Sequence, residues 1–152
     1  MARVIIIGGG WAGTAAAITA KKAGASVTII ERMDILLGLG NVGGIMRNNG
    51  RYTGAEECIL LGAGELFNIT DKAARHINID FPGHNHASLY DVCKVEPMAR
   101  KLIEELEINL LLKTRAIDVK LMDNTVTGIV LHDGRVVRSE EHTSELQSLS
   151  HL

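Results

Sequence analysis

Three glycines with the spacing Gly8-x-Gly10-x-x-Gly13 stand between an apolar run and a stretch of small helix-forming residues. The run Arg3–Ile7 is short and rich in β-branched residues, as in a strand buried on both faces. A helix is predicted from Thr14 to Ala23, and a second strand over Ser26–Ile30. A strand, a helix and a strand within about thirty residues require a parallel strand pair and a right-handed crossover.

Each glycine of this motif has a physical role in binding a dinucleotide. Gly8 allows a tight turn, Gly10 lets a pyrophosphate approach the backbone, and Gly13 lets the helix pack closely on the strand. The start of the helix adds free N–H groups and the positive end of its dipole. Glu31, eighteen positions after Gly13, can accept hydrogen bonds from ribose hydroxyls. The motif therefore predicts a dinucleotide site, and the alternative is a glycine turn in an ordinary α/β protein.

The rest of the chain predicts a mixed α/β domain. The expected elements are a glycine-rich loop over 33–52, a helix over 53–76 broken at Gly62 and Gly64, a loop over 80–86, an amphipathic helix over 91–107, a strand over 109–120, and a hairpin of 125–131 with 135–137. We expect a Rossmann-like α/β fold with a parallel sheet and a β-hairpin or meander.

Residues 4–31 resemble the N-terminal fingerprint of the flavoproteins with two dinucleotide-binding domains, which bind FAD. In that family a glycine-rich loop after the acidic residue approaches the flavin and the pyrophosphate, and Gly38–Gly44 stands at the corresponding position. The family's chain passes the adenine two residues after a threonine, which implies Ala116 after Thr114. The cofactor-binding residues expected on these grounds are Gly8, Gly10, Trp11, Ala12, Gly13, Glu31, Arg32, Gly43, Gly44 and Ala116.

The resemblance also implies a narrower class. The sequence is similar to FAD-dependent oxidoreductases grouped near the heterodisulfide reductase A subunit and, more distantly, to the GidA-type tRNA-modifying flavoproteins. The second flavin motif of these families, an Asp that holds the ribityl chain, is absent from this sequence. Some relatives carry iron–sulfur clusters, which need several cysteines at cluster spacing. With only Cys58 and Cys93, we expect such a cluster only in a missing part or in a partner.

Composition excludes several other functions. A formal charge of −2 and a pI near 6.3 give no electrostatic signal for nucleic acid or an anionic membrane. No stretch reaches the roughly 18 continuous apolar residues that a membrane helix needs. Two distant cysteines form neither a disulfide framework nor a zinc cluster, which fits a reducing cytoplasm.

Several polar residues outside the motif have both a functional and a structural interpretation. The segment Arg47–Arg51 contacts flavin or substrate, or forms a solvated turn. Cys58 and Cys93 are redox thiols or small core residues, and the second interpretation is favoured. His84 and His86 are interpreted as proton-transfer groups, as two ligands of a metal site, or as residues of a surface loop without such a role, and the last interpretation is favoured. The sequence names no catalytic residue and predicts no metal site.

The character of the chain changes at Arg138. The run from Arg138 to Ser148 resembles the translation, in one reading frame, of a common sequencing-library adapter, and a polar C-terminal helix is the alternative. We therefore expect residues 138–152 to be a non-native tail. Residues 1–137 are then the incomplete N-terminal part of an FAD-binding domain.

These observations predict the FAD-binding portion of a flavin-dependent oxidoreductase whose substrate is unknown. Its partner would be a small-molecule substrate or a redox protein. One alternative is a Rossmann module that binds NAD or an ADP-containing ligand without redox turnover. Another is a truncated fragment that is inactive by itself.

Overall fold

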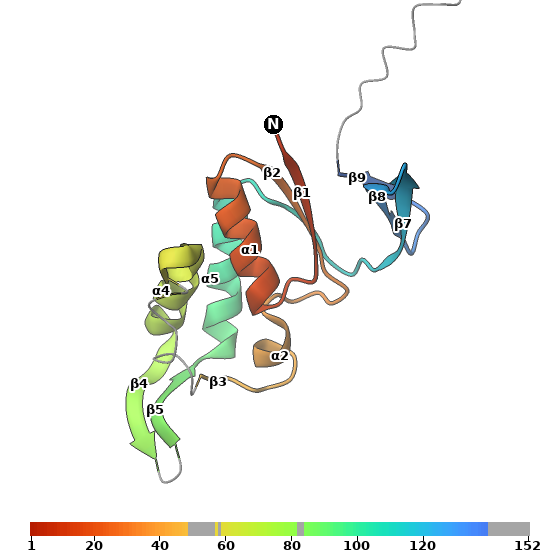
Figure 1. Ribbon diagram of the computed structural model, residues 1–152. Coiled ribbons are helices and arrows are strands. Elements are labelled where there is room, and N and C mark those ends of the chain that lie inside the picture. The colour runs from red at the N-terminus through yellow and green to blue at the C-terminus, as the bar shows by residue number, and fades with distance from the viewer. Residues whose placement is uncertain (49–56, 58, 82–83, 140–152) are drawn as a thin grey trace, which may run out of the picture. The chain divides into compact units, whose positions relative to one another are not determined.

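The computed structural model describes residues 1–48, 57, 59–81 and 84–139, which fall into two compact units. The first unit comprises Met1–Arg115 and the second begins at Ala116. Figure 1 follows the elements of both units in chain order. No helix within the described ranges is long and apolar enough to cross a membrane.

The predicted strand–helix–strand unit is present at the start of the chain (Figure 1). Strands β1 (Arg3–Ile7) and β2 (Ser26–Ile30) pair in parallel, and α1 (Trp11–Lys22) connects them. The short strand β6 (Asn109–Leu111) joins the other side of β2, so the sheet order is β1-β2-β6. The last four residues of β2 are buried, which accounts for its continuous apolar sequence. Helix α1 begins three residues before the predicted Thr14, directly after Gly10.

The core of the first unit combines α1, β2 and two later helices, α4 (Gly64–Lys72) and α5 (Val92–Glu105). Helix α5 confirms the amphipathic helix predicted over 91–107. Val95, Ala99 and Ile103 of its apolar face are fully buried in this core, while Val92, Leu102 and Leu106 pack against it partly buried. Asp91 begins α5 because its side chain accepts a hydrogen bond from the N–H of Cys93, at 3.0 Å.

The helix predicted over 53–76 is only partly present. A π-helical turn, η1 (Ile59–Ala63), leads into α4, and the predicted break lies at Gly62, whose φ is 109°. From Ala74 the chain is a strand and no longer a helix. Residues 53–56 and 58 of this prediction lie outside the described residues.

The loop predicted over 80–86 is wrong where the structure describes it. Strand β4 (Ala74–Phe81) pairs antiparallel with β5 (His84–Tyr90), and β3 (Arg47–Asn48) joins β5 to give the order β3-β5-β4. Polar and apolar residues alternate from His76 to Phe81. This period of two favours a strand as far as Phe81. Residues 82 and 83 of the predicted loop lie outside the described residues.

The second unit is a three-stranded antiparallel sheet. Strands β7 (Ala116–Met122), β8 (Thr125–Leu131) and β9 (Val136–Arg138) lie in the order β7-β8-β9, which confirms the predicted hairpin of β8 and β9. Arg138 pairs with Gly128, so backbone pairing extends into the run predicted to be a tail.

The single strand predicted over 109–120 is wrong, because β6 ends at Leu111 and β7 begins at Ala116. The intervening backbone turns back on the segment after β2. The N–H of Lys113 donates to the carbonyl of Met33, and the N–H of Thr114 donates to that of Glu31, both at 2.9 Å. These two bonds interrupt the regular strand.

Candidate functional site

The turn between β1 and α1, together with the first residues of the helix, leaves the helix start open; we refer to residues 8–13 as the glycine turn. Gly8 has a φ of 102°, and its N–H donates to the carbonyl of Ile30 at 2.8 Å. Gly10 is the N-cap of α1, and no side chain caps the first N–H groups. A Cβ added at Gly10 would have no heavy atom within 4 Å, whereas one at Gly13 would lie 1.9 Å from the carbonyl oxygen of Gly8. Gly13 therefore serves packing, and Gly10 leaves space beside an uncapped helix start, a kind of site that suits an anion.

Glu31 lies at the end of β2 with its carboxylate turned to the glycine turn. The side chain is almost buried, since the residue is 7% exposed. Its Oε2 accepts the N–H of Gly9 and its Oε1 accepts the N–H of Met33, both at 2.7 Å. Because each carboxylate oxygen can accept more than one hydrogen bond, both oxygens keep capacity for a ligand hydroxyl. The two backbone donors fix the orientation of that acceptor.

The segment after Glu31 folds back onto the glycine turn. Leu37 has a left-handed φ of 68°, and its N–H donates to the carbonyl of Gly9 at 2.7 Å. It leads into a short helix, α2 (Gly38–Asn41), within the loop predicted over 33–52. A Cβ at Gly38 would lie 3.3 Å from the Cα of Gly10, so the two backbones are in contact.

An aromatic pair fixes α2 against the start of α1. The rings of Trp11 and Tyr90 meet edge to face, with centroids 5.5 Å apart. Burial raises the pKa of the Tyr90 phenol, and the hydrogen bond to the indole of Trp11 lowers it to a smaller extent. A Cβ at Gly40 would lie 2.1 Å from the Tyr90 hydroxyl and 2.7 Å from the Trp11 Nε1. Only glycine fits between the two polar groups at this position.

The structure brings the glycine turn and Glu31 together, as the sequence predicts. The Arg32 side chain is exposed immediately after Glu31. Gly43 and Gly44 are exposed beyond α2, and the N–H of Gly43 donates to the carbonyl of Leu39. Ala116 is the first residue of β7 and belongs to the second unit.

The sequence interpretation missed several residues that shape this site. Gly9 is one of three consecutive glycines, and only its N–H bond to Glu31 reveals its role. Tyr90 and Gly40 are fifty positions apart, and no pattern links them. Glu96 and Arg100 carry a detectable signal, since opposite charges four positions apart meet on a helix.

The other predicted candidates lie away from these contacts or outside the described residues. Cys58 is outside them, and so are the side chains of Arg47, His84 and His86. Cys93 is exposed in the first turn of α5 and is a free thiol. Within the described part of the chain, no three His, Cys, Asp or Glu side chains form a group that could hold a metal ion.

A family model described as FAD dependent oxidoreductase matches residues 3–141. No curated protein gives a significant match to the sequence. Among solved structures, FqzB has a TM-score of 0.60 and 16% identity, over 90% of this chain and 33% of its own. Glycine oxidase from Bacillus cereus has a TM-score of 0.58 and 14% identity, over 93% of this chain and 55% of its own. L-Amino acid deaminase from Proteus myxofaciens has a TM-score of 0.51 and 14% identity, over 90% of this chain and 43% of its own.

The present chain thus spans only 33% to 55% of the length of these three proteins, and the likeness to them concerns the fold. The family model, in contrast, covers nearly the whole sequence and includes both the glycine turn and Glu31. The chain belongs to the FAD dependent oxidoreductase family, and its cofactor is FAD.

Proposed function

We propose that the glycine turn, the start of α1 and Glu31 bind the ADP half of FAD in a flavin-dependent oxidoreductase. The observation that carries the proposal is the Glu31 carboxylate, held by the N–H groups of Gly9 and Met33 beside the open position at Gly10. Its oxygens fit ribose hydroxyls, and the uncapped helix start fits a pyrophosphate. When bound, FAD supplies the electron-transfer chemistry, while the chain binds and orients it.

The same proposal extends to the remaining expected residues. Trp11 and Ala12 are in the first helical turn, where their backbone N–H groups are suited to the pyrophosphate. The exposed guanidinium of Arg32 follows Glu31 and would serve the adenosine end. Gly43 and Gly44 would approach the flavin, and the backbone of Ala116 the adenine, as the family resemblance implies.

For the whole protein we propose a flavin oxidoreductase similar to the heterodisulfide reductase A subunit and GidA-type enzymes. The support is the resemblance of residues 4–31 to the fingerprint of these flavoproteins. Its electron partner would be a small molecule or a redox protein in the reducing cytoplasm, in keeping with the low cysteine content. We propose that the 152-residue chain is an incomplete FAD-binding part without turnover of its own.

Titration calorimetry on the 152-residue chain with FAD, ADP and NAD tests the site. We expect FAD to bind more tightly than NAD and to compete with ADP. Glu31→Gln should lower the affinity for FAD and for ADP by about tenfold, because the side-chain NH₂ of the new glutamine would face one of the two backbone N–H donors. Glu105→Gln, on an exposed side chain of α5, is the control and should change nothing. Tighter binding of NAD, or an unchanged Glu31→Gln variant, would overturn the proposal.

A further inference from the structure

We propose that Glu96 and Arg100 of α5 are positioning residues for the dinucleotide site. In this proposal the pair holds the segment Asp34–Leu37 against the glycine turn, and the segment holds Gly9 beside Glu31. The inference rests on the proposed function for the identity of the ligand, and on contacts of the described residues for everything else.

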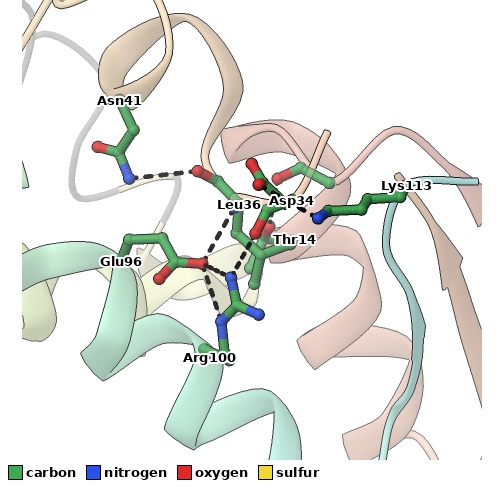
Figure 2. Close-up of polar contacts among 8 residues, drawn as sticks. Thr14, Asp34, Leu36, Asn41, Glu96, Arg100 and Lys113 are labelled. Carbon is green, nitrogen blue, oxygen red and sulfur yellow. Dashed lines mark hydrogen bonds and ion pairs between the residues drawn. The ribbon is translucent and has the colours of Figure 1, made fainter. Parts of the chain in front are cut away.

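Glu96 reaches from α5 to the backbone of this segment (Figure 2). Its Oε1 accepts the N–H of Leu36 at 3.2 Å and the Nε–H of Arg100 at 3.0 Å, and it also pairs with the Arg100 Nη2. The same Nη2 donates to the carbonyl oxygen of Asp34 at 2.8 Å. One ion pair on the helix therefore binds the segment at two backbone positions.

Leu36 transmits this constraint to the glycine turn. Its carbonyl accepts a hydrogen bond from the Asn41 side-chain amide at 3.2 Å, so both backbone groups of the residue are held (Figure 2). Its side chain is fully buried, and its Cδ2 lies 2.6 Å from the position that a Cβ on Gly9 would take. The next residue, Leu37, donates its N–H to the carbonyl of Gly9.

The path ends at the acceptor proposed for ribose. The carbonyl of Gly9 is held by Leu37 and its N–H by the Oε2 of Glu31, so the peptide planes around Gly9 are fixed from both sides. A shift of the segment would move Gly9 and release one of the two donors that orient Glu31. Contacts therefore connect α5 to the cofactor site without a gap.

A role in positioning accounts for a charged pair at this place better than a role in stability does. Glu96 is 7% exposed, and removing a carboxylate from water is unfavourable even when it is paired. Apolar side chains of similar volume fill such positions at equal or higher stability. Such apolar side chains cannot accept a hydrogen bond from the N–H of Leu36. A segment that is correctly placed for only a fraction of the time lowers the apparent affinity by that fraction.

Three variants and a matched control separate the two roles. Glu96→Leu removes the carboxylate that accepts the Leu36 N–H and puts an apolar side chain of similar volume in its place. Glu96→Gln keeps a carbonyl acceptor for Leu36. Arg100→Met removes the link to Asp34 together with the ion pair to Glu96, at a side chain that is partly exposed, and leaves the Glu96 acceptor for Leu36 in place. The control is Glu105→Leu, which breaks the exposed Lys101–Glu105 pair at the same spacing on the same helix.

Amide hydrogen exchange of the ligand-free chain and calorimetry with FAD are the two measurements. Glu96→Leu should speed amide exchange selectively at Leu36 and Leu37, and it should lower the affinity for FAD by about ten- to a hundredfold. Glu96→Gln should restore FAD affinity to within a few-fold of wild type, Arg100→Met should speed exchange in the segment alone, and the control should change neither.

Unchanged exchange at Leu36 in Glu96→Leu, or equal acceleration at every amide of the chain, would overturn the inference. If Glu96→Leu does not fold, unchanged exchange in Arg100→Met has the same meaning. A wild-type chain that binds no FAD would refute the proposed function, while the exchange data would still decide whether the pair positions the segment.

Discussion

A carboxylate that receives the hydroxyls of a ribose must be oriented before the ligand arrives. Glu31 meets this condition because two backbone N–H groups, one on each side, hold its two oxygens. Both donors belong to the main chain, so no neighbouring side chain supplies them. At the residue scale, the site is thus built from backbone conformation more than from side-chain chemistry.

The last two glycines of the glycine turn, Gly10 and Gly13, should respond differently to alanine. Gly10→Ala should leave the fold intact, because the new Cβ meets no heavy atom within 4 Å. It should lower the affinity for FAD, because the methyl group would occupy the space in which the pyrophosphate approaches the backbone. Gly13→Ala should destabilise the chain by about 1–3 kcal/mol, because its Cβ would lie 1.9 Å from a carbonyl oxygen. Urea denaturation and FAD titration of both variants check this. Equal loss of stability in the two would contradict the assigned roles.

Tyr90 should make the stability of the chain sensitive to alkaline pH. Burial raises its pKa above the ordinary 10.0, so the folded chain retains the phenol proton at pH values where the unfolded chain releases it. The contribution to stability is therefore complete below pH 10.0 and is lost as the pH rises through the folded-state pKa.

Urea denaturation across this pH range tests the effect. Wild type should lose stability faster above pH 10.0 than Tyr90→Phe, which has no proton to release at this position. Parallel pH profiles for the two chains would show that Tyr90 does not cause the loss.

At the scale of elements, α5 determines where the segment after β2 lies. Its start is fixed by Asp91, which accepts the Cys93 N–H and pairs with Arg75. Asp91→Ala should lower the free energy of unfolding by about 1 kcal/mol, as expected for loss of an N-cap, and Asp91→Asn should retain most of it. Thermal and urea denaturation measure both changes. An Asp91→Ala chain as stable as wild type would show that the Asp91 side chain does not stabilise the start of α5.

The elements that sequence predicts well are those whose pattern is local. The strand–helix–strand unit follows from an apolar run, a glycine turn and small helix formers, and α5 follows from its amphipathic stripe. The antiparallel β4–β5 pair also has a local signal, the alternation from His76 to Phe81, which the loop-favouring residue types at positions 82 and 83 obscured in the sequence. The split between β6 and β7 has no local signal, because hydrogen bonds to Glu31 and Met33 cause it.

The contacts that shape the site are less predictable for the same reason. The glycines at positions 8, 10 and 13 and the acidic residue at 31 belong to one motif with a characteristic spacing, so the sequence alone predicts their roles. No side chain fits at position 40 because Trp11 and Tyr90 lie next to Gly40, and only the fold brings these three residues together. The contact of Glu96 with Leu36 spans sixty positions. Such long-range pairs need the structure.

At the scale of the whole molecule, β1 is an edge strand of the sheet β1-β2-β6 within the described part of the chain. Among the described residues β1 hydrogen-bonds in the sheet only to β2, and Ile7 at its end is 59% exposed. An apolar edge strand is a template for pairing with another chain. We therefore expect the chain to associate as its concentration rises.

Light scattering over a concentration series tests this expectation, with Ile7→Lys as the comparison because edge lysines oppose such pairing. The variant should stay dispersed at concentrations where the wild type associates. A wild-type chain that remains monomeric throughout would show that the edge is not a pairing site.

Backbone amide NMR during an FAD titration shows whether the glycine turn and Glu31 hold the ADP half of FAD. We predict saturable shifts at the amides of Gly9, Gly10, Trp11, Ala12, Gly13 and Met33, reproduced by ADP at the same residues. Shifts confined to other parts of the chain, or no shifts with either ligand, would contradict the account.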